Sequence, residues 1–115
     1  MCGVLGAAVW ASASIRSGVY LRSLCRGDSP ERAVCLTFDD GPDPQCTPKL
    51  LDLLKRHGLQ ATFFLIGEKA QAHPELVRRM VDEGHTIGNH TWSHSARFPL
   101  RGKRFVHDEV ERGAE

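Results

Sequence analysis

The amino-acid sequence predicts an α/β fold in which about three βα units build a parallel sheet. Short apolar runs, rich in β-branched and aromatic residues, alternate with longer segments whose apolar side chains recur at helical spacing. Glycine or proline lies at most of the junctions between them. Strands that alternate with helices in this way pair in parallel, because each helix returns the chain to the starting edge of the sheet.

The first βα unit begins with the apolar run at residues 33–38, which ends at an Asp-Asp-Gly-Pro turn. This run predicts a buried strand, with Cys35 as a small buried residue inside it. A helix is expected over 48–57, with Thr47 as its N-cap and Pro48 at its first position. Its inward face is expected to carry Leu50, Leu51, Leu53 and Leu54.

Two further units follow the same pattern. Residues 61–66 predict a second buried strand, and residues 74–83 predict a second helix that ends at a glycine. Residues 85–89 predict a third, shorter strand, and a third helix is expected from Phe105 onward. The inward side chains of the second helix are expected to be Leu76, Val77, Met80 and Val81.

Chemically active side chains follow two of these strands. Asp39 and Asp40 come just after the first strand, and His90 and His94 just after the third. The carboxyl ends of parallel strands meet at one edge of a sheet, where ligands of α/β proteins gather. The sequence therefore predicts that all four side chains lie at the same edge.

This set of residues has the composition of a hydrolytic metal site. Two imidazoles and one carboxylate can bind a metal, and the second carboxylate is left over to act as a base. No carboxylate lies between His90 and His94, so the base must come from elsewhere, and Asp39 or Asp40 can supply it. Adjacent residues of an extended segment point to opposite sides, which would let the two aspartates play different parts.

Simpler interpretations exist for each motif alone. Adjacent aspartates before Gly-Pro are commonly a turn, and an isolated pair of histidines is commonly a coincidence of the surface. An aspartate-based phosphatase has a residue between its two aspartates. A non-haem iron oxygenase usually has the order His-x-Asp with a distant second histidine. Neither order occurs here. Three other histidines, His57, His73 and His107, have no such company and are expected at the surface or at helix caps. Trp92 is expected to pack around the loop.

The pairing of Thr37-Phe38-Asp39-Asp40-Gly41-Pro42 with His90-Thr91-Trp92-Ser93-His94 closely resembles the polysaccharide deacetylase family, metal-dependent carbohydrate esterases with a nodulation-protein-B homology domain. The resemblance implies a distorted, incomplete (β/α) barrel, of which residues 31–115 form an N-terminal portion. It implies hydrolysis of N- or O-linked acetyl groups of an acetylated polysaccharide or oligosaccharide.

Carried over by position, the resemblance makes Asp39 the catalytic base. It makes Asp40, His90 and His94 the ligands of a divalent metal, with Zn²⁺ favoured over Co²⁺, Mn²⁺ or Ni²⁺. Thr91 would brace the histidine loop by a hydrogen bond.

The family's later motifs are absent. The family follows these motifs with an arginine before proline and tyrosine, an Asp-x-x-Asp-Trp segment, and a Leu-x-His that carries the general acid. None of them occurs in this sequence. We therefore expect a domain truncated at its C-terminus and little activity from the chain alone. The alternative function is a catalytically incomplete fragment or a non-enzymatic carbohydrate- or metal-binding module.

Net charge, cysteine spacing and the N-terminal segment limit the partners, the cysteine chemistry and the location that can be expected. A net charge of +1 gives no electrostatic reason to expect nucleic acid as a partner. The four cysteines form no Cys-x-x-Cys pair, so neither a thiolate zinc site nor a disulfide framework is expected. Residues 1–30 are expected to form a leader that is disordered or a weak signal or anchor, and membrane association is expected only through it. This favours an extracytoplasmic location over a cytoplasmic one.

Overall fold

The computed structural model of the chain describes residues 33–96 and 101–115. The chain divides into two units, Met1–Ala33 and Val34–Glu115, and the second unit carries all the elements described below. The leader predicted over 1–30 lies outside the described residues. Within the described residues, none of the helices combines the length and the apolar character that a bilayer crossing needs.

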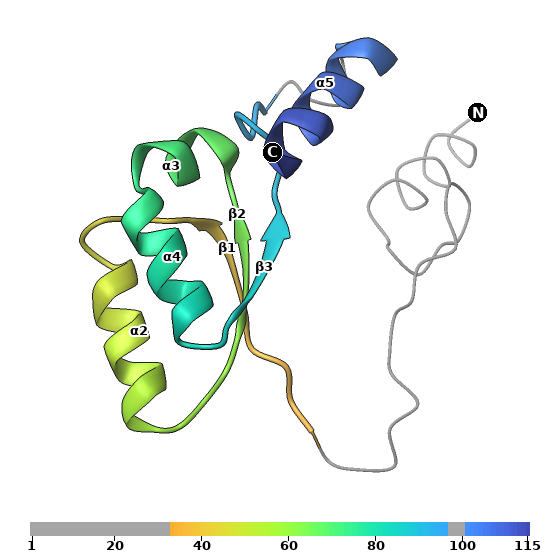
Figure 1. Ribbon diagram of the computed structural model, residues 1–115. Coiled ribbons are helices and arrows are strands. Elements are labelled where there is room, and N and C mark those ends of the chain that lie inside the picture. Colours follow the sequence, from red (N-terminus) through yellow and green to blue (C-terminus); the bar gives the residue numbers. More distant parts are fainter. Residues whose placement is uncertain (1–32, 97–100) are drawn as a thin grey trace. The chain divides into compact units, whose positions relative to one another are not determined.

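The second unit is a three-stranded parallel sheet with helices between its strands (Figure 1). The central strand β2 pairs with β1 on one side and with β3 on the other. This confirms the predicted α/β fold and its parallel sheet. In chain order the elements are β1 (Thr37–Gly41), α2 (Thr47–Arg56), β2 (Thr62–Leu65), α3 (Gly67–Ala72), α4 (Pro74–Asp82), β3 (Thr86–Asn89) and α5 (Gly102–Ala114).

The core lies between the sheet and helices α2 and α4. Alternate residues of β2, Phe63 and Leu65, face the helices, as the two-residue period of a strand requires. Leu51 and Leu54 of α2 and Met80 of α4 pack against them and are nearly inaccessible to solvent. Burial of these apolar side chains is the main source of stability for a unit of this size.

Two of the predicted inward side chains point to solvent. Leu53 is 44% exposed and Val81 is 57% exposed. A helix turns through about 100° per residue, so Leu53 lies about 200° around α2 from the buried Leu51. Val81 likewise falls beyond the narrow face of α4 that holds Leu76 and Met80. The prediction for Leu53 and Val81 was wrong because a single layer of helices buries only one stripe of each helix.

The prediction of a buried strand at residues 33–38 was also wrong. The strand starts at Thr37, and residues 33–36 are exposed and have no regular structure. Cys35, expected to be buried, is an exposed free cysteine. The physical reason is the position of β1, which pairs with β2 alone among the described strands and so lies at an edge of the sheet.

Helix α2 begins at a local hydrogen-bonded turn. Cys46, and not Thr47, is its N-cap, and Thr47 is its first residue and is buried. The carboxylate of Asp43 accepts hydrogen bonds from the backbone N–H groups of Gln45 (2.9 Å) and Cys46 (2.7 Å). These bonds, with that of Cys46 the largest cause, lower the pKa of Asp43 below its ordinary value of 3.8. Asp43 therefore organises the turn before α2, and the prediction of Thr47 as the N-cap was wrong.

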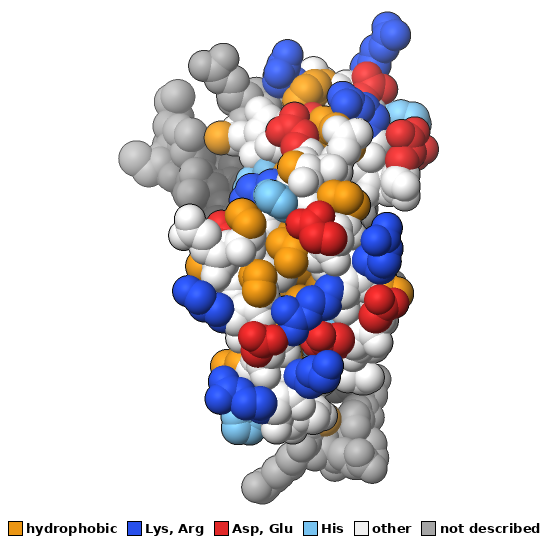
Figure 2. Space-filling view, turned by 60° about the vertical axis from the view of Figure 1, so that its left-hand side comes forward, with side chains coloured by type: hydrophobic (Ala, Val, Ile, Leu, Met, Phe, Trp, Pro, Cys, Tyr) orange, Lys and Arg blue, Asp and Glu red, His pale blue; other side chains and the backbone are white. Residues whose placement is uncertain are grey.

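Charged side chains join α2 to α4 on the outer surface. Arg79 of α4 donates to Asp52 of α2 and, at 2.9 Å, to Glu83 at the end of its own helix. Hydrogen bonds to these two carboxylates, Asp52 first, raise the pKa of Arg79. Figure 2 shows basic and acidic side chains interspersed on this side of the molecule. No broad surface of one sign covers it.

Candidate metal centre

Asp40 reaches the site from an irregular end of β1. The register between β1 and β2 shifts between Phe38 and Gly41, and Asp40 has a φ of 64°. Lys69 of α3 donates a hydrogen bond of 2.8 Å to the backbone carbonyl of Asp40. Asp39 and Asp40 therefore lie inside the last residues of the strand, not just past it. The predicted alternation, in which the two adjacent side chains point to opposite sides of an extended strand, does not describe them. The backbone of Asp40 is left-handed, and this conformation changes the direction of its side chain.

His90 and His94 lie on the loop that follows β3, as predicted. The backbone N–H of His90 bonds to the carbonyl of Leu65 at 2.9 Å, which fixes the start of the loop against β2. Thr91 and His94 have φ values of 66° and 47°. The backbone N–H of His94 donates to the hydroxyl of Thr91 at 3.2 Å, which confirms the bracing role expected for that threonine.

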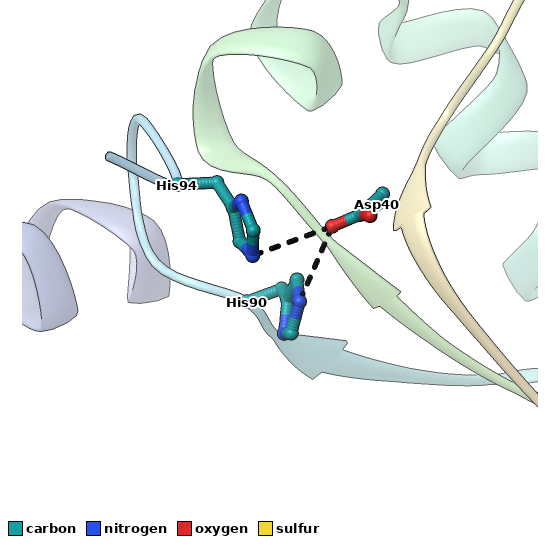
Figure 3. A group of neighbouring side chains, drawn as sticks. All are labelled: Asp40, His90 and His94. Carbon is teal, nitrogen blue, oxygen red and sulfur yellow. Dashed lines mark ion pairs between the residues drawn. The ribbon is translucent and has the colours of Figure 1, made fainter. Parts of the chain in front are cut away.

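The three predicted ligands meet at the carboxyl edge of the sheet (Figure 3). Asp40 Oδ1 lies 3.3 Å from His90 Nε2 and 3.5 Å from His94 Nε2. The two imidazole rings stack, with centroids 4.8 Å apart. Two histidines of one loop therefore point toward one carboxylate oxygen from the far strand of the sheet.

This donor set fits a divalent metal ion. Its three ligand atoms lie within 4.8 Å of one another. Atoms bound about 2.0–2.2 Å from a tetrahedral ion lie roughly 3.3–3.6 Å apart, which matches the two distances of Asp40. Two imidazole nitrogens and one carboxylate oxygen are also a ligand set of catalytic zinc sites, which keep a further position open. Exposure of Asp40 and His94 leaves room for it.

Asp39 stands beside this cluster and does not belong to it. It is exposed, it precedes Asp40 in β1, and it is not one of the residues whose ligand atoms gather. Its assignment as a base remains a prediction.

Further residues that the sequence did not single out shape the histidine loop. Ser93 donates two hydrogen bonds to Glu109 of α5, and Asn89 accepts one from the N–H of Thr91. Helix α3, absent from the predicted elements, donates its first backbone N–H groups to the carbonyls of Thr91 and Trp92. Glu109 resembles any solvated helix carboxylate in sequence, so only the loop contact reveals it.

The side chains expected to be structural are structural in the fold. The ring of Trp92 packs against Gly67 and lies under the guanidinium of Arg112, 4.2 Å from its centroid. His57 is the C-cap of α2, and His73 lies between α3 and α4, while His107 is exposed on α5. The expectations for Trp92 and for these histidines are confirmed.

Comparison with known proteins decides the family. A model of the family described as polysaccharide deacetylase matches residues 26–113. The chain belongs to the polysaccharide deacetylase family. Among curated relatives, a peptidoglycan-N-acetylglucosamine deacetylase of Bacillus cereus is 62% identical over 61 residues, which are 53% of this chain and 22% of the relative. A chitooligosaccharide deacetylase of Sinorhizobium fredii is 51% identical over 91 residues, which are 79% of this chain and 42% of the relative.

Solved structures agree with this membership in the polysaccharide deacetylase family. A peptidoglycan N-acetylglucosamine deacetylase is similar with a TM-score of 0.66 at 47% identity, over 69% of this chain and 36% of that one. A family 4 carbohydrate esterase from Streptomyces lividans is similar with a TM-score of 0.65 at 40% identity, over 70% and 41%. The chain thus spans about a fifth to two fifths of the length of these two curated relatives, and its fold corresponds to part of each of the two solved structures.

Proposed function

We propose that this chain supplies the metal-binding half and the base of a deacetylase site that hydrolyses acetyl groups of a polysaccharide or oligosaccharide. The observation that carries the proposal is the convergence of Asp40, His90 and His94 at one sheet edge. Membership in the polysaccharide deacetylase family supports the same chemistry. The donor set favours Zn²⁺, with Co²⁺, Mn²⁺ and Ni²⁺ as alternatives.

The residues would divide the work as follows. Asp40, His90 and His94 hold the ion, which when bound lowers the pKa of a coordinated water and polarises a carbonyl oxygen. Asp39, exposed on the same strand, accepts the proton of the attacking water. Hydrolysis adds one water to the acetyl linkage and yields acetate and a free amine or hydroxyl group. The leaving group needs a proton from an acid.

The relatives favour an N-acetylated sugar as the substrate. Their names specify peptidoglycan N-acetylglucosamine and chitooligosaccharide. We therefore propose N-acetylglucosamine units of an oligosaccharide or glycan as the first substrates to test, and O-acetylated xylan as the comparison. An open, exposed ligand cluster suits a long saccharide chain, which can lie across a sheet edge.

The test measures acetate release from N-acetylglucosamine oligomers, with metal content determined on the same preparation. Because the chain lacks the family's general-acid motif, we expect slow release that a chelator abolishes and that Zn²⁺ or Co²⁺ restores. Asp40→Ala should lose both metal and release, whereas Asp82→Ala, on the exposed surface of α4, should change neither. Release that persists after chelation and in Asp40→Ala would overturn the metal assignment.

A second candidate function is favoured by one observation, namely that the sequence contains no Leu-x-His segment for the general acid. In that case the chain binds metal and saccharide without turnover. Metal bound by Asp40, His90 and His94, together with saccharide binding but no acetate release, would select this function. Turnover by the 115-residue chain would eliminate it.

A further inference from the structure

The loop that presents both histidines is held in a conformation that its sequence alone does not favour. Thr91 and His94 both have positive φ, which L-residues with a side chain rarely adopt. Among the described residues, the only other non-glycine residue at positive φ is Asp40, the third ligand. Such backbone strain persists only where surrounding contacts over-determine it. The contacts around this loop are therefore part of the site.

One side of the loop is held by backbone groups of helix α3. The N–H groups of Gly67 and Glu68 donate to the carbonyls of Thr91 and Trp92, both at 3.0 Å. These bonds fix the beginning and the middle of the loop. They do not reach Ser93, the residue that directly precedes the second histidine.

Helix α5 holds the other side through a carboxylate. Glu109 Oε2 accepts a hydrogen bond from the backbone N–H of Ser93, and Oε1 accepts one from the Ser93 hydroxyl, both at 2.8 Å. Glu109 is only 6% exposed, although most of α5 faces solvent. Burial of a carboxylate is unfavourable unless donors satisfy both its oxygens. Here the two donors of Ser93 meet that need.

The rest of α5 fits around the same loop. The side-chain amide of Asn89 donates to the carbonyl of Val110 at 2.7 Å. Gly113 has no side chain, and a Cβ there would come within 2.9 Å of the carbonyl carbon of Thr91. Helix α5 therefore makes close contacts with both ends of the histidine loop. Two of its charged groups take part, namely the guanidinium of Arg112, which lies over the ring of Trp92, and the carboxylate of Glu109, which bonds to Ser93.

We propose that Glu109 is a positioning residue for the metal centre. It acts through Ser93, whose backbone it fixes, and so holds His94 in the orientation that places Nε2 near Asp40. This inference rests on the proposed function, because it assigns Glu109 to the same metal site. Outer contacts that orient ligands typically change metal affinity by about 10–100-fold when they are removed.

The experiment titrates the metal-free 115-residue chain with Co²⁺ and follows the visible absorption of the bound ion. Glu109→Ala should weaken Co²⁺ binding by about 10-fold or more and alter the spectrum. The matched control is Glu111→Ala, which removes the same charge from an exposed position of the same helix. It should bind Co²⁺ within about twofold of the unaltered chain. Glu109→Gln keeps one acceptor and one donor for Ser93 and should restore most of the affinity.

Circular dichroism of each metal-free variant separates positioning from folding. If Glu109→Ala does not fold, Ser93→Ala carries the test, since it removes only the hydroxyl bond. Ser93→Ala should weaken Co²⁺ binding several-fold with an unchanged metal-free melt. In the double variant the two losses of affinity should not add, because both substitutions disrupt the same contact between Glu109 and Ser93. Unchanged affinity in a folded Glu109→Ala, or in Ser93→Ala when the former does not fold, overturns the inference. Failure of the unaltered chain to bind Co²⁺ overturns the proposed function instead.

Discussion

Asp40 lies in one outer strand of the sheet and His90 directly follows the other, yet Asp40 Oδ1 lies 3.3 Å from His90 Nε2. Strand β2 separates β1 from β3, so the two side chains must reach toward each other across it. The register shift in β1 and the positive φ of Asp40 turn its carboxylate inward, and the loop after β3 brings the imidazole to meet it. Irregular backbone at two strand ends thus builds the ligand cluster.

Substitution of the two aspartates should separate their roles. Asp40→Asn replaces an anionic ligand by a neutral one, and asparagine tolerates positive φ, so the backbone of β1 should survive while metal is lost. Asp39→Asn should keep its metal but lose turnover by about 100-fold or more, because the amide cannot accept the water proton. Metal stoichiometry after gel filtration, measured beside acetate release, distinguishes the two. Equal metal loss in both variants would show that both aspartates are ligands.

Metal binding should stabilise the fold. A ligand that binds only the native state adds RT ln(1 + [L]/Kd), which is about 2.7 kcal/mol at 100-fold excess over Kd. For a domain of this size each kcal/mol raises Tm by about 4–8 °C. We expect Zn²⁺ to raise the Tm of the metal-free chain accordingly and a chelator to reverse the rise. His94→Ala should melt at the same temperature with and without Zn²⁺, whereas the exposed His107→Ala should respond as the unaltered chain does.

The sequence predicted the convergence of the three candidate ligands better than the surroundings that hold them. Asp40, His90 and His94 could be found because the ends of parallel strands share one edge, whatever the details of packing. Glu109 could not, because its burial depends on a loop contact that no spacing along α5 reveals. The edge position of β1 was equally hidden, since an apolar run such as 33–38 looks the same in a central strand and in an edge strand. The local pattern of apolar residues predicts whether a segment forms a helix or a strand, whereas the elements packed against it determine which of its side chains are exposed.

The two faces of α2 offer a direct test of that distinction. Leu51→Ala should destabilise the chain by about 2–5 kcal/mol, because the side chain is fully buried in the core. Leu53→Ala makes the same chemical change two residues away at an exposed position. It should alter the free energy of unfolding by no more than about 0.5 kcal/mol. Urea unfolding of both variants measures the difference. Similar losses in the two would mean that the packing of α2 differs from the one described.

The turn at Asp43 should make stability depend on acid. The pKa of Asp43 is lower in the folded chain than its ordinary value of 3.8, so its contribution is fully present above pH 3.8. It is lost as the pH falls from there through the lower folded pKa. Asp43→Ala should therefore melt below the unaltered chain at neutral pH, and the gap should narrow at the acid end. Asp43→Asn, which keeps the acceptor oxygen, should lie between them. A difference in melting temperature that does not change with pH would show that the ionisation of Asp43 does not contribute to stability.

The contact of Gly67 with Trp92 joins the start of α3 to the histidine loop. A Cβ at Gly67 would overlap the indole ring of Trp92, so Gly67→Ala must displace that ring or the loop that carries it. The N–H of Gly67 also bonds to the carbonyl of Thr91, next to His90. We expect Gly67→Ala to destabilise the chain by about 1–3 kcal/mol and to weaken Co²⁺ binding measurably. Adding Trp92→Leu to Gly67→Ala makes room for the new methyl group and should recover part of the metal affinity. If Gly67→Ala lowers stability but leaves Co²⁺ affinity unchanged, the histidine loop is positioned independently of α3, and the contacts from α5 alone suffice to hold it.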